Sequence, residues 1–231
     1  MEGRISILHV FADQGAEDPT LAKYGDVFRL SINAKANQWS ETVTADATKL
    51  PLKQSAQFDL GVFHPPCGFV SPMSDTGSGS RDDWPNLIPV AREIAHKHTD
   101  HYIIENKPSD YIDESVVLDG HMFNLGIEYA RAFECSFPVE QPPRQQQLAE
   151  TSPFYYTEKP KGWWAAMKQS AMDFSKQHLA KDTIPGVYLE YLLGHYYKAT
   201  ETADLPDYSE YNKQMDTRRS KAVNSELGDY E

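Results

Sequence analysis

Two side chains with chemical potential each follow a strand-like segment. Cys67 lies in Pro65-Pro66-Cys67-Gly68, directly after the apolar segment 58–63, and Glu105 follows the segment 101–104. Because proline cannot continue a sheet ladder, the chain must leave the sheet and present the thiol at the strand's carboxyl end. Open α/β sheets bind their ligands at this edge. The pattern indicates Cys67 as a nucleophile and Glu105 as an acid; a small buried thiol and a solvated carboxylate are the plainer alternatives.

The elements that must position these residues alternate along the chain. Strands are predicted at 5–12, 26–32, 41–47, 58–63, 101–104 and 132–137, and helices at 19–24, 87–95, 123–132 and 184–197. Parallel strands need crossover connections, which are usually helical. We therefore expect an α/β fold, with a mostly parallel, twisted sheet that is Rossmann-like and carries helices on both faces.

Composition limits the classes of function. The 231 residues carry a net charge of −12, with 2 cysteines, and show no apolar run long enough to cross a membrane. We expect an intracellular, cytoplasmic protein without broad affinity for polyanions, so any contact with nucleic acid must be a local basic patch. His96, His98 and His101 cluster without a completing ligand, so no metal is expected.

The order of motifs over residues 5–198 resembles the DNA (cytosine-5) methyltransferase family. Pro65-Pro66-Cys67 with Ser71 is similar to its Pro-Cys nucleophile loop, and Glu105-Asn106-Lys107 to its Glu-Asn-Val motif. The resemblance implies a Rossmann-like S-adenosylmethionine-dependent methyltransferase fold in a compact, phage-like member. The implied activity is methyl transfer from S-adenosylmethionine to carbon 5 of cytosine in DNA through a covalent Cys67 adduct, with Glu105 holding a proton for the ring nitrogen N3.

The motifs that bind the cofactor lack several of the family's residues. Asp13 and Ala16 replace two glycines of its first motif, and Asn33 replaces the acid that binds ribose. By resemblance, the cofactor-binding positions are Phe11, Asp13, Gly15, Asn33, Asp46, Ala47, Pro65, Asp182 and Thr183. For most of these the alternative is an ordinary turn or helix-capping residue.

The motifs that bind the target are also reduced. Arg144 is the single arginine near the family's Gln-x-Arg-x-Arg position and is expected to help catalysis, while Gln146 departs from the pattern. Ser71, Asn106, Lys159 and Lys161 are the expected substrate contacts. Trp163 and Trp164 either stack on bases or pack in the core.

The expected organisation is a catalytic domain over 1–200, with a short target-recognition segment at about 148–178, and a polar tail over 201–231. Two alternatives to DNA methylation stay open. One is the same chemistry on another pyrimidine, in RNA or a free nucleotide. The other is a catalytically inactive, methyltransferase-like interaction protein, motivated by the departures in the cofactor motifs.

Overall fold

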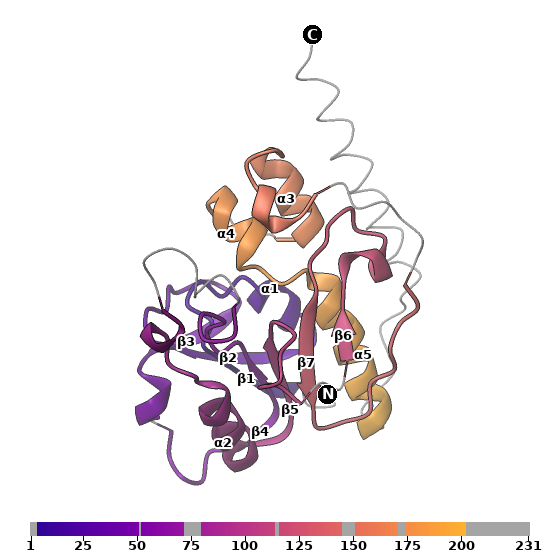
Figure 1. The fold of residues 1–231 in the computed structure, drawn as a ribbon. Coiled ribbons are helices and arrows are strands. Elements are labelled where there is room, and N and C mark those ends of the chain that lie inside the picture. The colour runs from indigo at the N-terminus through magenta and orange to yellow at the C-terminus, as the bar shows by residue number, and fades with distance from the viewer. Residues whose placement is uncertain are drawn as a thin grey trace. The chain divides into compact units, whose positions relative to one another are not determined.

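A computed structural model describes residues 4–50, 52–71, 80–113, 116–144, 151–170 and 174–201 (Figure 1). The chain forms two compact units: Met1–Leu118 with Ala130–Pro142, and Asp119–Tyr129 with Pro143–Glu231. Past Glu201 the predicted polar tail lies outside the described residues, and the domain bounds expected from the sequence stay a prediction. None of the helices in the described ranges is long and apolar enough to cross a membrane.

The first unit is built on a seven-stranded sheet in the order β3-β2-β1-β4-β5-β7-β6. Its strands are β1 (Ile5–Val10), β2 (Gly25–Ser31), β3 (Ser40–Thr44), β4 (Phe58–Phe63), β5 (Thr99–Asn106), β6 (Val116–Leu118) and β7 (Arg131–Cys135). The pairs among β1 to β5 are parallel, and β7 runs antiparallel to both of its neighbours. The predicted Rossmann-like, mostly parallel sheet is confirmed.

The two faces of this sheet carry different side chains. Helix α2 (Ile88–His98) packs Ala91, Ile94 and Ala95 on an apolar face made by Leu8, Val10, Leu30, Phe63 and Ile104. Because side chains alternate along a strand, His9 and Arg29 point to the opposite face. There the short helix α1 (Asp18–Leu21) joins them through Asp18. The prediction of helices on both faces of the sheet is thus confirmed, with α2 on one face and α1 on the other.

The second unit contains α3 (Lys161–Lys168), α4 (Lys176–Lys181) and α5 (Gly186–Thr200). The predicted apolar helix 184–197 is α5, which begins after Pro185. Trp163 and Trp164 are both buried in α3, and their rings meet edge to face at 5.0 Å. The tryptophans therefore belong to the core, and the alternative of exposed stacking faces is wrong for them.

The helix predicted over 123–132 is wrong. A 3-10 turn, Gly120–Phe123, ends at Asn124, whose φ of 56° is left-handed and stops helical propagation. A Cβ at Gly120 would lie 2.1 Å from the carbonyl oxygen of Ile127, so the two backbones are in direct contact. Ile127 then bridges to Thr151 as an extended residue. The apolar residues Leu125, Ile127 and Tyr129 of this segment are buried without forming a helix.

Candidate active site

The loop that carries Cys67 leaves the sheet at the end of β4 and is tied to the end of β5. Asn106 donates its side-chain amide to the carbonyl oxygen of Pro65 at 2.8 Å, and Lys107 Nζ donates to Ser71 Oγ at 2.8 Å. Cys67 is a free, half-buried thiol between these two ties. Asn106 and Ser71, expected as substrate contacts, thus hold the loop in place.

Gly68 allows an aromatic ring to lie against this loop. A Cβ at this position would come within 2.3 Å of the Trp84 ring. Trp84 is itself 49% exposed. A partly exposed aromatic ring therefore lies against Gly68, the residue that follows Cys67.

Asn106→Ala is expected to destabilise the protein by about 1–3 kcal/mol, because Pro65 O loses its donor and the amide of Lys107 loses the Asn106 oxygen it reaches at 2.8 Å. Urea denaturation of the purified chain measures the change. Gln57→Ala is the matched control, since Gln57 makes an exposed amide contact to Asp100 and should cost at most about 0.5 kcal/mol. Equal effects of the two substitutions would mean that Asn106 does not hold the loop.

Glu105, at the end of β5, is 2% exposed and lies between two cationic or protonatable groups. Arg131 Nε, from the first residue of β7, donates to Oε1, and His64 Nδ1 lies 3.0 Å from Oε2. Burial alone would raise the pKa of Glu105, but the charges and hydrogen bonds of Arg131 and His64 lower it to about 2. The carboxylate form of Glu105 is therefore favoured in the folded protein, and its predicted role as an acid stays a prediction.

Arg131 was not predicted from the sequence. It could have been noticed because it is the first residue of a segment, Arg131–Cys135, that is otherwise mostly apolar and buried. Arg144, the arginine expected to serve catalysis, is exposed and belongs to the second unit. The guanidinium that pairs with Glu105 thus comes from inside the sheet.

A second buried ion pair lies at the ends of β1 and β2. Asp18 Oδ1 is 2.6 Å from His9 Nδ1, and Asp18 Oδ2 is 2.8 Å from Arg29 Nε. Asn37 and Ser40 also donate to Oδ2, at 2.7 and 2.6 Å. Burial raises the pKa of Asp18, but the contacts with His9, Ser40 and Asn37 outweigh it and lower the pKa. Neither His9 nor Asp18 was predicted, because the apolar run of the first strand masks the histidine.

The turn after β1 has the unusual backbone expected of a ligand-binding loop. Phe11 has a φ of 64° and Gly15 a φ of 63°. A non-glycine residue in this region is strained, and such strain collects at binding sites. A Cβ at Gly15 would lie 2.5 Å from Asp18 Oδ2, so glycine is required there.

Asp13 reaches from this turn to the end of β2. Its Oδ1 accepts hydrogen bonds from Ser31 Oγ and, at 3.2 Å, from the amide of Asn33. At the end of β3, Asp46 caps the 3-10 turn Ala47–Lys49 by accepting from Thr48. The hydrogen bonds from Thr48 lower the pKa of Asp46. Carboxylates therefore stand at the carboxyl ends of β2 and β3.

Four other predicted positions belong to the second unit: Lys159, Lys161, Asp182 and Thr183. Asp182 ends α4 and lies 3.3 Å from His178, while Thr183 is buried and accepts from Lys168 through its carbonyl. Lys159 Nζ lies 5.2 Å from the centroid of the Trp163 ring, and Lys161 is exposed. Gln146 lies outside the described residues.

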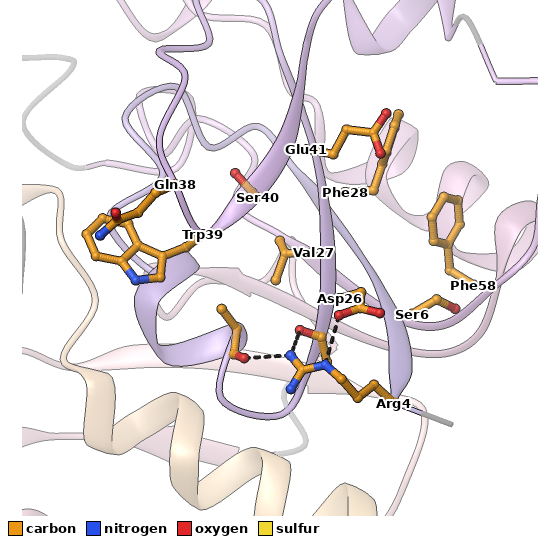
Figure 2. Close-up of a pocket in the computed structure, with 12 residues that line it drawn as sticks. Arg4, Ser6, Asp26, Val27, Phe28, Gln38, Trp39, Ser40, Glu41 and Phe58 are labelled. Atoms are coloured by element: carbon orange, nitrogen blue, oxygen red, sulfur yellow. Dashed lines mark hydrogen bonds and ion pairs between the residues drawn. The ribbon is translucent and has the colours of Figure 1, made fainter. Parts of the chain in front are cut away.

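An open hollow of about 590 Å³ lies at the other edge of the sheet, at the amino ends of β2, β3 and β4 (Figure 2). Val27, Phe28, Trp39 and Phe58 line it, and Arg4 closes one side by binding Asp26 and two backbone carbonyls. It contains none of the predicted site residues.

No protein-family model and no curated protein matches the chain. Among solved structures, a Thermoplasma acidophilum protein is 17% identical with a TM-score of 0.32, over 46% of this chain and 53% of that one. A candidate RNA methyltransferase of Pyrococcus horikoshii is 11% identical with a TM-score of 0.33, over 47% and 54%. An S-adenosylmethionine-dependent methyltransferase of Mesorhizobium loti is 15% identical with a TM-score of 0.32, over 51% and 53%. This chain thus spans about half the length of these three structures.

Proposed function

We propose that the protein transfers a methyl group from S-adenosylmethionine to carbon 5 of cytosine in DNA, with Cys67 as nucleophile. The observation that carries the proposal is the pairing of two strand ends: Asn106 holds the Cys67 loop beside the buried Glu105–Arg131 pair. These are the positions that the Pro-Cys and Glu-Asn motifs predict. The Rossmann-like sheet supports the same class of enzyme.

The Cys67 thiolate would add to carbon 6 of the ring, which makes carbon 5 nucleophilic enough to accept a methyl group. S-adenosylmethionine would supply that methyl group from its sulfonium and would leave as the neutral thioether S-adenosylhomocysteine. A base then removes the carbon-5 proton, and the Cys67 thiolate is expelled as the 5,6 double bond reforms. Since the carboxylate form of Glu105 is favoured, we assign it the role of accepting a hydrogen bond from the 4-amino group, with Arg131 balancing its charge.

The residues around the turn after β1 fit this cofactor. Family members hold the ribose hydroxyls with an acid at the end of β2, where this chain has Asn33. Asp13 is half-buried and lies at that same strand end, bound to Ser31 and Asn33 through Oδ1. We infer that Asp13 supplies the carboxylate that the family has at the position of Asn33. Asp13 itself occupies a position where the family has a glycine.

Asp13→Asn is expected to weaken S-adenosylmethionine binding about tenfold, because a charge-assisted hydrogen bond contributes about 1.5 kcal/mol more than none. Asparagine keeps an oxygen for Ser31 and the Asn33 amide, so the fold should persist. Calorimetry with the intact chain measures the affinity, and Asp26→Asn, an exposed carboxylate paired with Arg4, is the matched control. An unchanged affinity in Asp13→Asn would remove Asp13 from the cofactor site.

The proposed reaction is tested with radiolabelled S-adenosylmethionine and four substrates: duplex DNA, single-stranded DNA, RNA and free deoxynucleotides. Transfer to DNA that maps to carbon 5 of cytosine supports the proposal. Transfer only to RNA or nucleotides would assign the same chemistry to another pyrimidine. No cofactor binding at millimolar concentration would instead support an inactive interaction protein.

A further inference from the structure

The face of the sheet opposite α2 carries a row of charged and histidine side chains near the carboxyl ends of its strands. His9 on β1 is in register with Arg29 on β2 and with Val62 on β4. His64 lies two residues after Val62, and therefore on the same face. Since Phe63 pairs with Ile104, His64 stands beside Glu105.

The row consists of two series of contacting side chains. Each series runs from an arginine to a carboxylate and ends at a histidine. On one side, Arg29 binds Asp18, and Asp18 binds His9 Nδ1 at 2.6 Å. On the other side, Arg131 binds Glu105, and Glu105 binds His64 Nδ1 at 3.0 Å. Each carboxylate therefore fixes the orientation of one imidazole ring and leaves its Nε2 atom pointing away from the carboxylate.

The two histidine rings are neighbours in the interior. Both Nε2 atoms are buried and lack a hydrogen-bond partner among the described residues, and the ring centroids are 5.1 Å apart. Glu17, which precedes α1 and is 7% exposed, brings a carboxylate to the same place. Ligand atoms of His9, Glu17 and His64 all lie within 4.8 Å of one another.

We propose that His9 Nε2, His64 Nε2 and the Glu17 carboxylate bind a divalent transition-metal ion of the zinc class. Two imidazoles and one carboxylate are a ligand set that such ions favour. A carboxylate on the second nitrogen of each histidine is the outer-shell arrangement that orients imidazole ligands and raises their basicity. The proposal does not depend on methyl transfer.

The geometry of the cluster suits this ion. Bonds of about 2.0–2.1 Å from the ion to each ligand would place tetrahedral ligand atoms about 3.3 Å apart. The ligand atoms of His9, Glu17 and His64 lie no more than 4.8 Å apart. Glu17, which is 7% exposed, brings a carboxylate to the two imidazoles as the third ligand. An ordinary pair of buried histidines would leave two polar nitrogens without partners, which is costly.

Three protein ligands leave at least one coordination position for water or an oxygen of a bound molecule. The ion would also join the start of α1, strand β1 and the end of β4. His64 is three residues before Cys67 in the sequence. Metal binding would therefore stabilise the base of the loop that presents the thiol.

The test uses the intact, tag-free chain, stripped with a chelator and titrated with zinc chloride against a chromophoric competitor. One equivalent should bind tightly, and the melting temperature should rise as mass action requires. Cobalt(II) substitution should give visible d–d bands without a thiolate-to-cobalt charge-transfer band, because neither cysteine is a proposed ligand.

His9→Gln and His64→Gln should each weaken zinc binding by at least about 100-fold, and Asp18→Asn, which acts through the orientation of His9, by about 10–100-fold. His98→Gln is the matched control. His98 is also buried with an unpartnered Nε2, but its Nδ1 lies against the carbonyl of Ala56 and it is outside the cluster. Its zinc affinity should be unchanged.

Glu17→Gln keeps the size of the side chain and guards against loss of folding in the histidine variants. It should fold, by circular dichroism, and bind zinc at least about tenfold more weakly. The proposal is overturned if the wild-type chain binds no zinc at 100 µM, or if Glu17→Gln and the histidine variants bind it as tightly as His98→Gln does.

Discussion

Cys67→Ser is expected to bind S-adenosylmethionine like the wild-type protein and to lose at least about 10³-fold of its rate of methyl transfer. A serine hydroxyl is a far weaker nucleophile than a thiolate toward carbon 6 of a pyrimidine, and the structure places no second cysteine on the Cys67 loop in the part it describes. Single-turnover kinetics with the best DNA substrate measure the loss.

Cys135→Ser is the matched control for this substitution. Cys135 lies at the end of β7, where burial and then the neighbouring Glu134 raise the pKa of its thiol, so it is a poor nucleophile. Its replacement should leave the rate within about twofold, the range expected when no reacting group is touched. Methyl transfer by Cys67→Ser at the rate of Cys135→Ser would disprove covalent catalysis by Cys67.

The same mechanism predicts a stable adduct when the target cytosine carries fluorine at carbon 5. A base cannot remove fluorine as it removes a proton, so the Cys67–carbon 6 bond should persist after methyl transfer. Denaturing electrophoresis of wild-type protein incubated with such DNA and S-adenosylmethionine should show a shifted band that Cys67→Ser lacks. A shifted band formed by Cys67→Ser would assign the adduct to another residue.

The end of β5 holds the loop of the site at three points. Asn106 and Lys107 bind Pro65 and Ser71. The carboxylate of Glu105 binds His64, where the loop begins. A nucleophile on a loop gains precision when rigid elements support it, because a displacement of about 1 Å can cost a factor of 10² in rate.

The sequence predicted the strand ends well because their signals are local. The apolar run 58–63 followed by two prolines marks the end of β4, and the end of β5 is marked by Glu105 and Asn106 after an apolar stretch. These features predict where β4 and β5 end, and from them Cys67 and Glu105 are expected at neighbouring strand ends. They say nothing of protonation, which depends on partners elsewhere in the chain.

The partners of Glu105 and the histidine cluster could not be read from the sequence. Arg131 reaches Glu105 only because β7 inserts next to β5 in one register, and His9 meets His64 only because β1 and β4 pair as they do. A shift of one residue in either pairing would turn these side chains to the opposite face. Register is set by packing over the whole sheet, which single-sequence patterns do not fix.

Arg131→Met is expected to lower the free energy of unfolding by about 3–5 kcal/mol, the usual cost of leaving one partner of a buried ion pair uncompensated. Glu105 is 2% exposed, so water cannot replace the guanidinium. Methionine keeps much of the length and apolar stem of arginine, so the loss reports the charge more than the packing. Urea denaturation at neutral pH measures it.

A double variant separates the charge from the shape of the site. Glu105→Gln with Arg131→Met removes both charges while the glutamine oxygen still accepts from His64, so most of the stability lost in Arg131→Met should return. Asp26→Asn, which breaks an ion pair exposed by 78% at the aspartate, should cost at most about 1 kcal/mol. If Arg131→Met costs no more than Asp26→Asn, the buried Glu105–Arg131 pair does not form in solution. Arg131 would then not support the ionised state of Glu105 on which its proposed catalytic role rests.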